Sequence, residues 1–193
     1  MKTQTIALGI ASVATFAFVP SCASTPRHHV SATNASAAQI AHNSRSALHS
    51  LYAQDPSARA LGKRAKAVLV FPSIVKGGFV VGAEGGNGAM IRGGEISGYY
   101  QTVAASYGLQ AGVQEFGYAL FLMDDQALTN FTRSGGWEFG GSPNVVVVDR
   151  GVATSLSTTT VRRGTYAYFF NQRGLMGGLS LQGTKITRIQ PQG

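Results

Sequence analysis

A chain of 193 residues is long enough to bury a core and has the length of one domain rather than several. Its hydrophobic share of 44% is normal for a folded protein, whereas its charged share of 12% is about half the usual fraction. The net charge of +8 favours anionic partners such as lipid headgroups, nucleic acid or acidic polymers, although a basic soluble surface gives the same balance. Composition alone therefore indicates a basic folded domain.

The first residues are typical of a bacterial export signal. Lys2 supplies a positive charge, and residues 6–18 form an apolar run that is shorter than the ~20 residues of a bilayer span. The sequence VPSC at residues 19–22 then resembles the lipobox of bacterial lipoproteins, and Cys22 is the only cysteine in the chain. We expect residues 1–21 to be a signal peptide and Cys22 to carry acyl chains of the palmitate type. An ordinary signal peptide followed by an incidental cysteine is the alternative.

The segment after this cysteine predicts the subcellular localisation of the protein. Ser24 comes after the cysteine, and there is no aspartate at that place. This pattern resembles the outer-membrane sorting default of Gram-negative lipoproteins. We therefore expect an outer-membrane lipoprotein of the bacterial cell envelope. Residues 22–37 are rich in Ser, Thr and Ala, which predicts a flexible tether, and His28 and His29 within it are interpreted as solvated residues. Residues 38–193 remain for a single domain.

Two helices are predicted at the start of this domain. Apolar residues recur at helical spacing between residues 38 and 52. Asp55 and Pro56 then supply an N-cap and a proline at the first helical position, so a second helix is expected from residue 57 to about residue 66.

The second predicted helix holds the densest group of positive charges in the chain. A solvated helix face is one interpretation of this group. The other is a surface for anionic headgroups, because basic amphipathic helices commonly lie on anionic membranes. The four cations are Arg59, Lys63, Arg64 and Lys66.

Glycine changes the character of the chain after residue 76. Gly62 is the only glycine between residues 23 and 76, whereas glycines then recur to residue 183. Such spacing interrupts helices and permits bulges, tight turns and close strand approach. Short strands are expected at 67–71, 78–83, 89–92, 96–105, 110–123, 145–149, 153–161, 165–170, 179–181 and 185–189.

A short helix is also predicted from residue 126 to residue 132, with Asp124 as its N-cap. The strands at 153–161 and 165–170 are expected to form a hairpin, and those at 179–181 and 185–189 to pair around Gly183. The predicted fold class is α+β: an N-terminal helical pair packed on a mostly antiparallel glycine-rich sheet or closed barrel.

No catalytic, metal or cofactor site is expected. All histidines precede residue 50 and lie outside the predicted sheet, which removes the commonest general base from it. The glycine-rich residues 84–88 lack the Gly-Lys-Ser/Thr of a phosphate loop, and the carboxylates are scattered. There is no recognised nucleic-acid motif, and an exported chain would not meet nucleic acid. We therefore expect a non-enzymatic protein without a nucleic-acid partner.

Three segments carry a family resemblance. They are AVLVFPSIVKGGF from residue 67, with glycines continuing to residue 92; SYGLQAGVQ at 106–114; and YAYFFNQRGLMGGLSLQG at 166–183. In this order they resemble the SYLF domain family, first associated with yeast actin-patch proteins and also found in bacterial lipoproteins. The resemblance covers roughly residues 58–189.

The resemblance implies lipid binding, because eukaryotic members bind phosphoinositide-rich membranes through basic N-terminal surfaces. Actin binding is not carried over to an envelope lipoprotein, and another anionic phospholipid is expected as the partner. The alternatives are an envelope interaction module with a protein or peptidoglycan partner, and a carrier of a small apolar ligand. The residues at matching positions are Arg59, Lys63, Arg64, Lys66 and Lys76.

Overall fold

The computed structural model of this chain describes residues 35–78, 81–107, 112–133, 137–138, 145–148, 163–173 and 183–192. All of them belong to one compact unit, Ser31–Gly193. The predicted signal peptide, Cys22 and most of the predicted tether lie outside the described residues.

The three predicted helices are confirmed, each with a side-chain cap at its start. Helix α1 (Ala37–Gln54) begins after Ser36, whose hydroxyl accepts a hydrogen bond from the amide of Gln39. Helix α2 (Pro56–Arg64) begins at the predicted proline, directly after the predicted cap Asp55. Helix α3 (Asp125–Thr132) is capped by Asp124, as expected.

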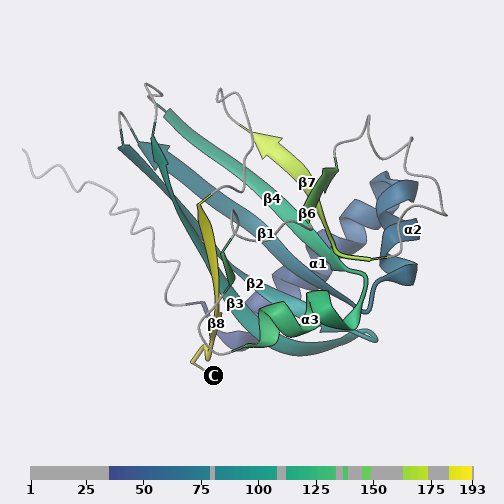
Figure 1. Cartoon of the computed structure of the whole chain (residues 1–193). Coiled ribbons are helices and arrows are strands. Elements are labelled where there is room, and N and C mark those ends of the chain that lie inside the picture. Colours follow the sequence, from purple (N-terminus) through teal and green to yellow (C-terminus); the bar gives the residue numbers. More distant parts are fainter. Residues whose placement is uncertain are drawn as a thin grey trace, which may run out of the picture. The chain divides into compact units, whose positions relative to one another are not determined.

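The strands form one sheet in the order β5-β8-β3-β2-β1-β4-β7-β6. All neighbours are antiparallel except β6 and β7, which are parallel. The sheet is curled (Figure 1), and within the described residues no pairing joins the edge strands β5 and β6. The predicted α+β class is thus confirmed, with a half-barrel sheet in place of a closed barrel. The strands are β1 (Ala67–Gly78), β2 (Val81–Arg92), β3 (Glu95–Tyr107), β4 (Gly112–Leu122), β5 (Trp137–Glu138), β6 (Val145–Val148), β7 (Thr165–Arg173) and β8 (Thr184–Ile189).

Strands β1 and β2 differ most in length from the sequence prediction. Strand β1 continues past residue 71 to residue 78 through an irregularity between Phe71 and Ile74. The segments predicted as separate strands at 78–83 and 89–92 are a single strand, β2. A Cβ atom on Gly86 or Gly88 would collide with backbone oxygens and side chains of β1, so these glycines permit close approach instead of ending the strand.

Two predicted hairpins involve segments outside the described residues, 153–161 and 179–181. Their predicted partners are described. Strand β7 pairs with β4 on one side and with β6 on the other over residues 165–168, which leaves no free edge there for a hairpin partner. Strand β8 pairs with β3 and, at residues 185–186, with β5.

Both faces of the sheet are buried in its central part, which explains why β1 begins as a continuous apolar run. Alternate residues point to opposite faces. On the α1 face, α1 and α2 pack on Val68, Val70, Ala119, Phe121, Tyr166, Tyr168 and Phe170. On the α3 face, α3 packs with Leu69, Phe71, Ile74, Met90, Tyr100, Phe116, Tyr118, Leu120, Leu122, Trp137, Ala167 and Ile186.

Candidate functional site

Helix α2 is fixed to the sheet by the carboxylate at its start. One oxygen of Asp55 accepts hydrogen bonds from the backbone amides of Ser57, at 2.8 Å, and Ala58, at 3.1 Å. The other oxygen accepts from the buried hydroxyl of Tyr168 in β7. The same residue therefore caps the helix and ties it to a strand distant in sequence.

The buried side of α2 completes this attachment. Ala58 and Leu61 lie in the core of the α1 face. The phenol of Tyr52 lies against Gly62, where any Cβ atom would collide with its ring. Burial raises the pKa of Tyr52 to about 12. Gly62 therefore makes room for the Tyr52 ring between α1 and α2.

The opposite side of α2 is basic and exposed. The Nε of Arg59 donates to the carbonyl of Tyr52 at 3.0 Å. The Nζ of Lys66 lies 3.3 Å from a carboxylate oxygen of Asp125, with both side chains at least half exposed. We call this group of four exposed cations the α2 basic surface: Arg59, Lys63, Arg64 and Lys66.

The start of α3 borders this surface and alters its charge. Asp125, the ion-pair partner of Lys66, is the first residue of α3. Its neighbour Asp124 accepts hydrogen bonds from the amides of Ala127, at 2.7 Å, and Gly164, at 2.8 Å. These bonds hold the pKa of Asp124 below its usual value, and the charge of Arg163 acts in the same direction. Arg163 is exposed and was not assigned to the site from the sequence. Its place beside the predicted cap is set by pairing of β7 with β4, which the sequence does not reveal.

Lys76 does not join the α2 basic surface. It lies on β1 and its side chain is on the α3 face, directly opposite Glu84 of β2. The Nζ of Lys76 is 3.9 Å from a carboxylate oxygen of Glu84, and the two side chains are only 13% and 7% exposed. Burial raises the pKa of Glu84, and the nearby ammonium of Lys76 partly opposes that rise.

Lys76 and Glu84 belong to a row of residues that crosses the sheet. Gln114 lies opposite Lys76 on the other neighbouring strand, and Thr184 occupies the same row on β8. We call these four buried or nearly buried residues the polar layer. The pairing of residues 76 and 84 was not predicted from the sequence, because a strand was expected across 78–83 and no turn there. The burial of the pair was not predicted either, because its neighbours in the row, Gln114 and Thr184, lie on strands that are distant in sequence.

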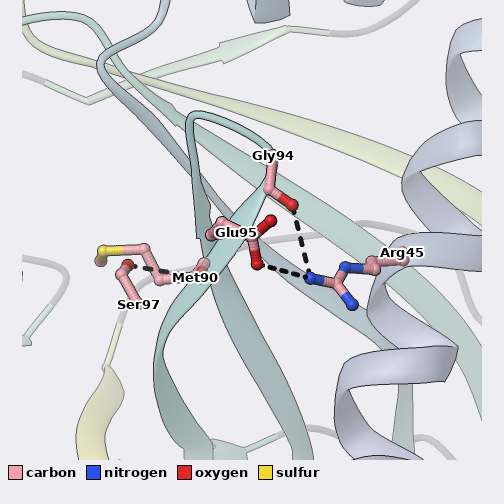
Figure 2. A network of polar contacts seen from close by, with 5 residues as sticks. All are labelled: Arg45, Met90, Gly94, Glu95 and Ser97. Atoms are coloured by element: carbon pink, nitrogen blue, oxygen red, sulfur yellow. Dashed lines mark hydrogen bonds and ion pairs between the residues drawn. The ribbon is translucent and has the colours of Figure 1, made fainter.

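A second polar network joins α1 to the turn between β2 and β3 (Figure 2). Arg45 donates to the carbonyl of Gly94 at 3.4 Å and lies 3.5 Å from a carboxylate oxygen of Glu95. On the far side of the turn, the hydroxyl of Ser97 donates to the carbonyl of Met90 at 3.3 Å. Gly93 and Gly94 both have positive φ, at 58° and 87°, as this tight turn requires.

Two features are absent from the described part of the chain. None of its helices combines the length and the apolar character needed to cross a membrane. Within the same ranges, no three His, Cys, Asp or Glu side chains gather where they could hold a metal ion.

The family model described as Ysc84, Las17-binding protein actin regulator, matches residues 103–191. The matched segment includes β4 and β7, which pair with each other, and β4 also pairs with β1 outside the match. No curated protein matches the sequence. This match, a SYLF family model over residues 103–191, is consistent with the resemblance drawn from the motifs.

Proposed function

We propose that this protein is a lipid-anchored component of the bacterial envelope whose non-enzymatic SYLF domain binds anionic phospholipid through the α2 basic surface. The observation that carries the proposal is the exposure of four cations on a short segment whose opposite side is locked to the sheet. A basic residue close to an anionic membrane contributes about 1 kcal/mol to binding. The attachment of α2 presents these charges together, without an ordering cost on binding.

The cations of this surface do not contribute equally. Lys66 is paired with Asp125 at 3.3 Å, and that carboxylate is itself repelled by an anionic surface. Lys63 has no carboxylate partner among the described residues. We therefore expect Lys63 to contribute more to vesicle binding than Lys66. Lys76 is excluded from the contact because its buried pair faces the other side of the sheet.

Anchoring is the second part of the proposal. Acylation of Cys22 would hold the domain at the membrane permanently, since two or more acyl chains give stable attachment where one is marginal. Binding by α2 would then orient the domain on the membrane rather than recruit it. Mass spectrometry of the mature protein from envelope fractions tests this part. A diacylated or triacylated residue 22 and recovery in the outer-membrane fraction are expected, and an unmodified cysteine would contradict it.

Vesicle co-sedimentation of the chain from residue 23 onward tests headgroup binding without the anchor. This chain retains the whole compact unit 31–193. We expect pelleting with vesicles of equal phosphatidylglycerol and phosphatidylcholine, and none with phosphatidylcholine alone. Arg59→Gln with Lys63→Gln should weaken pelleting about tenfold or more, since two favourable contacts of about 1 kcal/mol are lost.

The matched control removes the same net charge elsewhere. Arg92→Gln with Arg173→Gln changes two exposed arginines outside the α2 basic surface and should leave most of the pelleting intact. Equal loss in both double variants would mean that only net charge matters, and equal pelleting of the native chain and the α2 variant would remove α2 from the mechanism. Failure of the native chain to pellet would overturn the proposal.

An envelope interaction module is the second candidate, and one observation favours it. Val103 and Val113 are 46% and 69% exposed on the α1 face, beyond the part covered by the helices. Cross-linking in intact envelopes to a single protein or to peptidoglycan, without dependence on anionic lipid, would support this reading. An apolar-ligand carrier has less support because aromatic side chains already fill the centre of the α3 face.

A further inference from the structure

A cavity of about 760 Å³ lies at the opposite end of α1 from the α2 basic surface. Its walls come from the first residue of α1, the end of α3, the start of β3 and the last residues of β8. The volume is in the range of small-molecule sites, which is roughly 300–1,000 Å³. The residues used below are Ala37, Ile96, Arg133, Arg188, Ile189 and Pro191.

Two arginines are the only charged residues that line this cavity among the described part of the chain. One Nη of Arg188 donates to the carbonyl of Ser97 at 3.3 Å, which leaves most of its donors available. The guanidinium of Arg133 has no hydrogen-bond or ion-pair partner among the described residues. Guanidinium groups bind phosphate oxygens through paired N–H donors, so two of them at one cavity favour a phosphate group.

Among the described residues, no carboxylate lines the cavity to cancel this charge. Glu95, the acid next to its wall in sequence, is paired with Arg45 of α1, as Figure 2 shows. The two helix ends at the cavity have dipoles of opposite sign, because α1 begins there and α3 ends there. The arginines therefore decide the sign of the ligand.

The rest of the lining includes apolar side chains. Ile96, Ile189 and Pro191 offer a surface that a free inorganic ion would not use. A ligand that carries an apolar part beside its phosphate would use this surface.

We propose that this cavity binds the phosphate group of a phospholipid, with Arg133 and Arg188 as its anion ligands and the apolar wall against the glycerol and first acyl carbons. The proposal rests on the membrane-anchored function above and adds a second lipid contact to it. The same chemistry would accept a soluble phosphate ester, so the experiment separates these two sources.

Calorimetric titration of the chain from residue 23 onward uses two probes. The first is dihexanoylphosphatidylglycerol, kept below the concentration at which it forms micelles, and the second is glycerol 3-phosphate, which lacks acyl chains. Saturable binding of the first and at least tenfold weaker binding of the second are expected. Equal affinity for both would assign the site to soluble phosphate esters and overturn the phospholipid assignment, and no binding of either would overturn the site.

Variants connect the binding to the arginines. Arg133→Gln with Arg188→Gln should raise the dissociation constant for the short-chain lipid at least tenfold, whereas Arg92→Gln with Arg173→Gln should leave it within about twofold. Arg133→Lys with Arg188→Lys keeps the charge but loses the paired donors, and an intermediate affinity is expected. Near-ultraviolet circular dichroism shows whether each variant is folded, and the single Arg133→Gln variant, which breaks no described contact, serves if the double variant is not. Unchanged affinity in a folded cavity variant would contradict the assignment.

The two lipid contacts are separable by experiment. Arg59→Gln with Lys63→Gln should reduce vesicle pelleting and leave titration with the short-chain lipid unchanged. Loss of short-chain binding in this variant would place that lipid at α2 and overturn the cavity site. If the native chain fails to pellet with vesicles but binds the short-chain lipid in the titration, the proposed role of the α2 basic surface is overturned and the cavity site is retained.

Discussion

Two lysine–glutamate pairs bridge neighbouring strands of this sheet, and in both the charged atoms are 3.9 Å apart. Lys76 and Glu84 join the central strands β1 and β2, where their side chains are 13% and 7% exposed. Lys185 and Glu138 join β8 to the edge strand β5, where they are 50% and 71% exposed. Residue types and separation match, so burial is the main variable.

This comparison shows how the position of a strand in the sheet changes the meaning of a charged residue. An exposed pair gains little because water screens it, and a buried pair depends on each partner to offset the desolvation of the other. Lys76 was grouped with the cations of α2 because it falls in the segment that resembles the family. In the fold, the strand that carries it is central, and its ammonium is committed to Glu84.

The largest effect is expected from removing one partner of the central pair. Lys76→Met should lower the free energy of unfolding at pH 7 by roughly 3 kcal/mol, because Glu84 remains buried without a cation. The matched edge variant, Lys185→Met, should cost less than about 1 kcal/mol. Urea denaturation of both variants measures the difference. Similar losses would mean that burial does not distinguish the two pairs.

The pH dependence of the Lys76→Met variant sharpens the same comparison. Burial raises the pKa of Glu84 in the folded state, and removing the ammonium removes the effect that lowers it. A raised folded-state pKa favours the fold below the unfolded value, near 4.3, and this contribution is lost as the pH rises through the folded-state pKa. The deficit of the variant should therefore shrink on acidification toward pH 4. Lys76→Met with Glu84→Leu should recover most of the loss at pH 7.

The next largest effect on the free energy of unfolding is expected at Asp55, which fixes helix α2 to the sheet. Asp55→Ala removes the helix cap and leaves the buried hydroxyl of Tyr168 without this acceptor, which should cost about 2 kcal/mol. Tyr168→Phe removes only the tie to β7 and should cost about 1 kcal/mol. Thermal unfolding measures both. Vesicle binding by folded Asp55→Ala should fall as well, and unchanged binding would show that fixing α2 is unnecessary.

The sequence predicted local features well and tertiary ones poorly. Asp55, Pro56 and Asp124 identified helix starts because capping depends on neighbouring residues. The glycines of β2 were interpreted as strand breaks because their role depends on Phe71 and Ile74, which cross over them from β1. The distribution of basic residues was similarly ambiguous. Helical spacing grouped the cations of α2, but the cavity arginines belong to segments more than 50 positions apart that only the fold brings together.

A smaller effect is expected at the N-cap of α3. Asp124→Asn should lower the free energy of unfolding at pH 7 by about 1 kcal/mol, since an amide replaces a carboxylate that accepts two backbone hydrogen bonds. The pKa of Asp124 is lowered in the folded state, so its charge stabilises the fold above the unfolded value, near 3.9, and this contribution is lost as the pH falls through the folded-state pKa. The native chain should lose stability below about pH 4, and the variant should lose less over the same range. Parallel acid titrations followed by circular dichroism would contradict this if the curves differed by a constant offset.

The smallest effect on stability is expected at the exposed pair between Lys66 and Asp125, which lie 3.3 Å apart. Asp125→Asn should change the free energy of unfolding by no more than about 0.5 kcal/mol, because both side chains are largely solvated. Asp125→Asn should strengthen membrane binding, and this gain should be easier to detect than the small loss of stability. The reason is that the variant removes a negative charge beside the α2 basic surface. We expect stronger pelleting with phosphatidylglycerol vesicles and a gain that declines between 50 and 300 mM salt as screening increases. Glu138→Gln removes the same charge at the sheet edge, so an equal gain there would reduce the α2 contact to a net-charge effect.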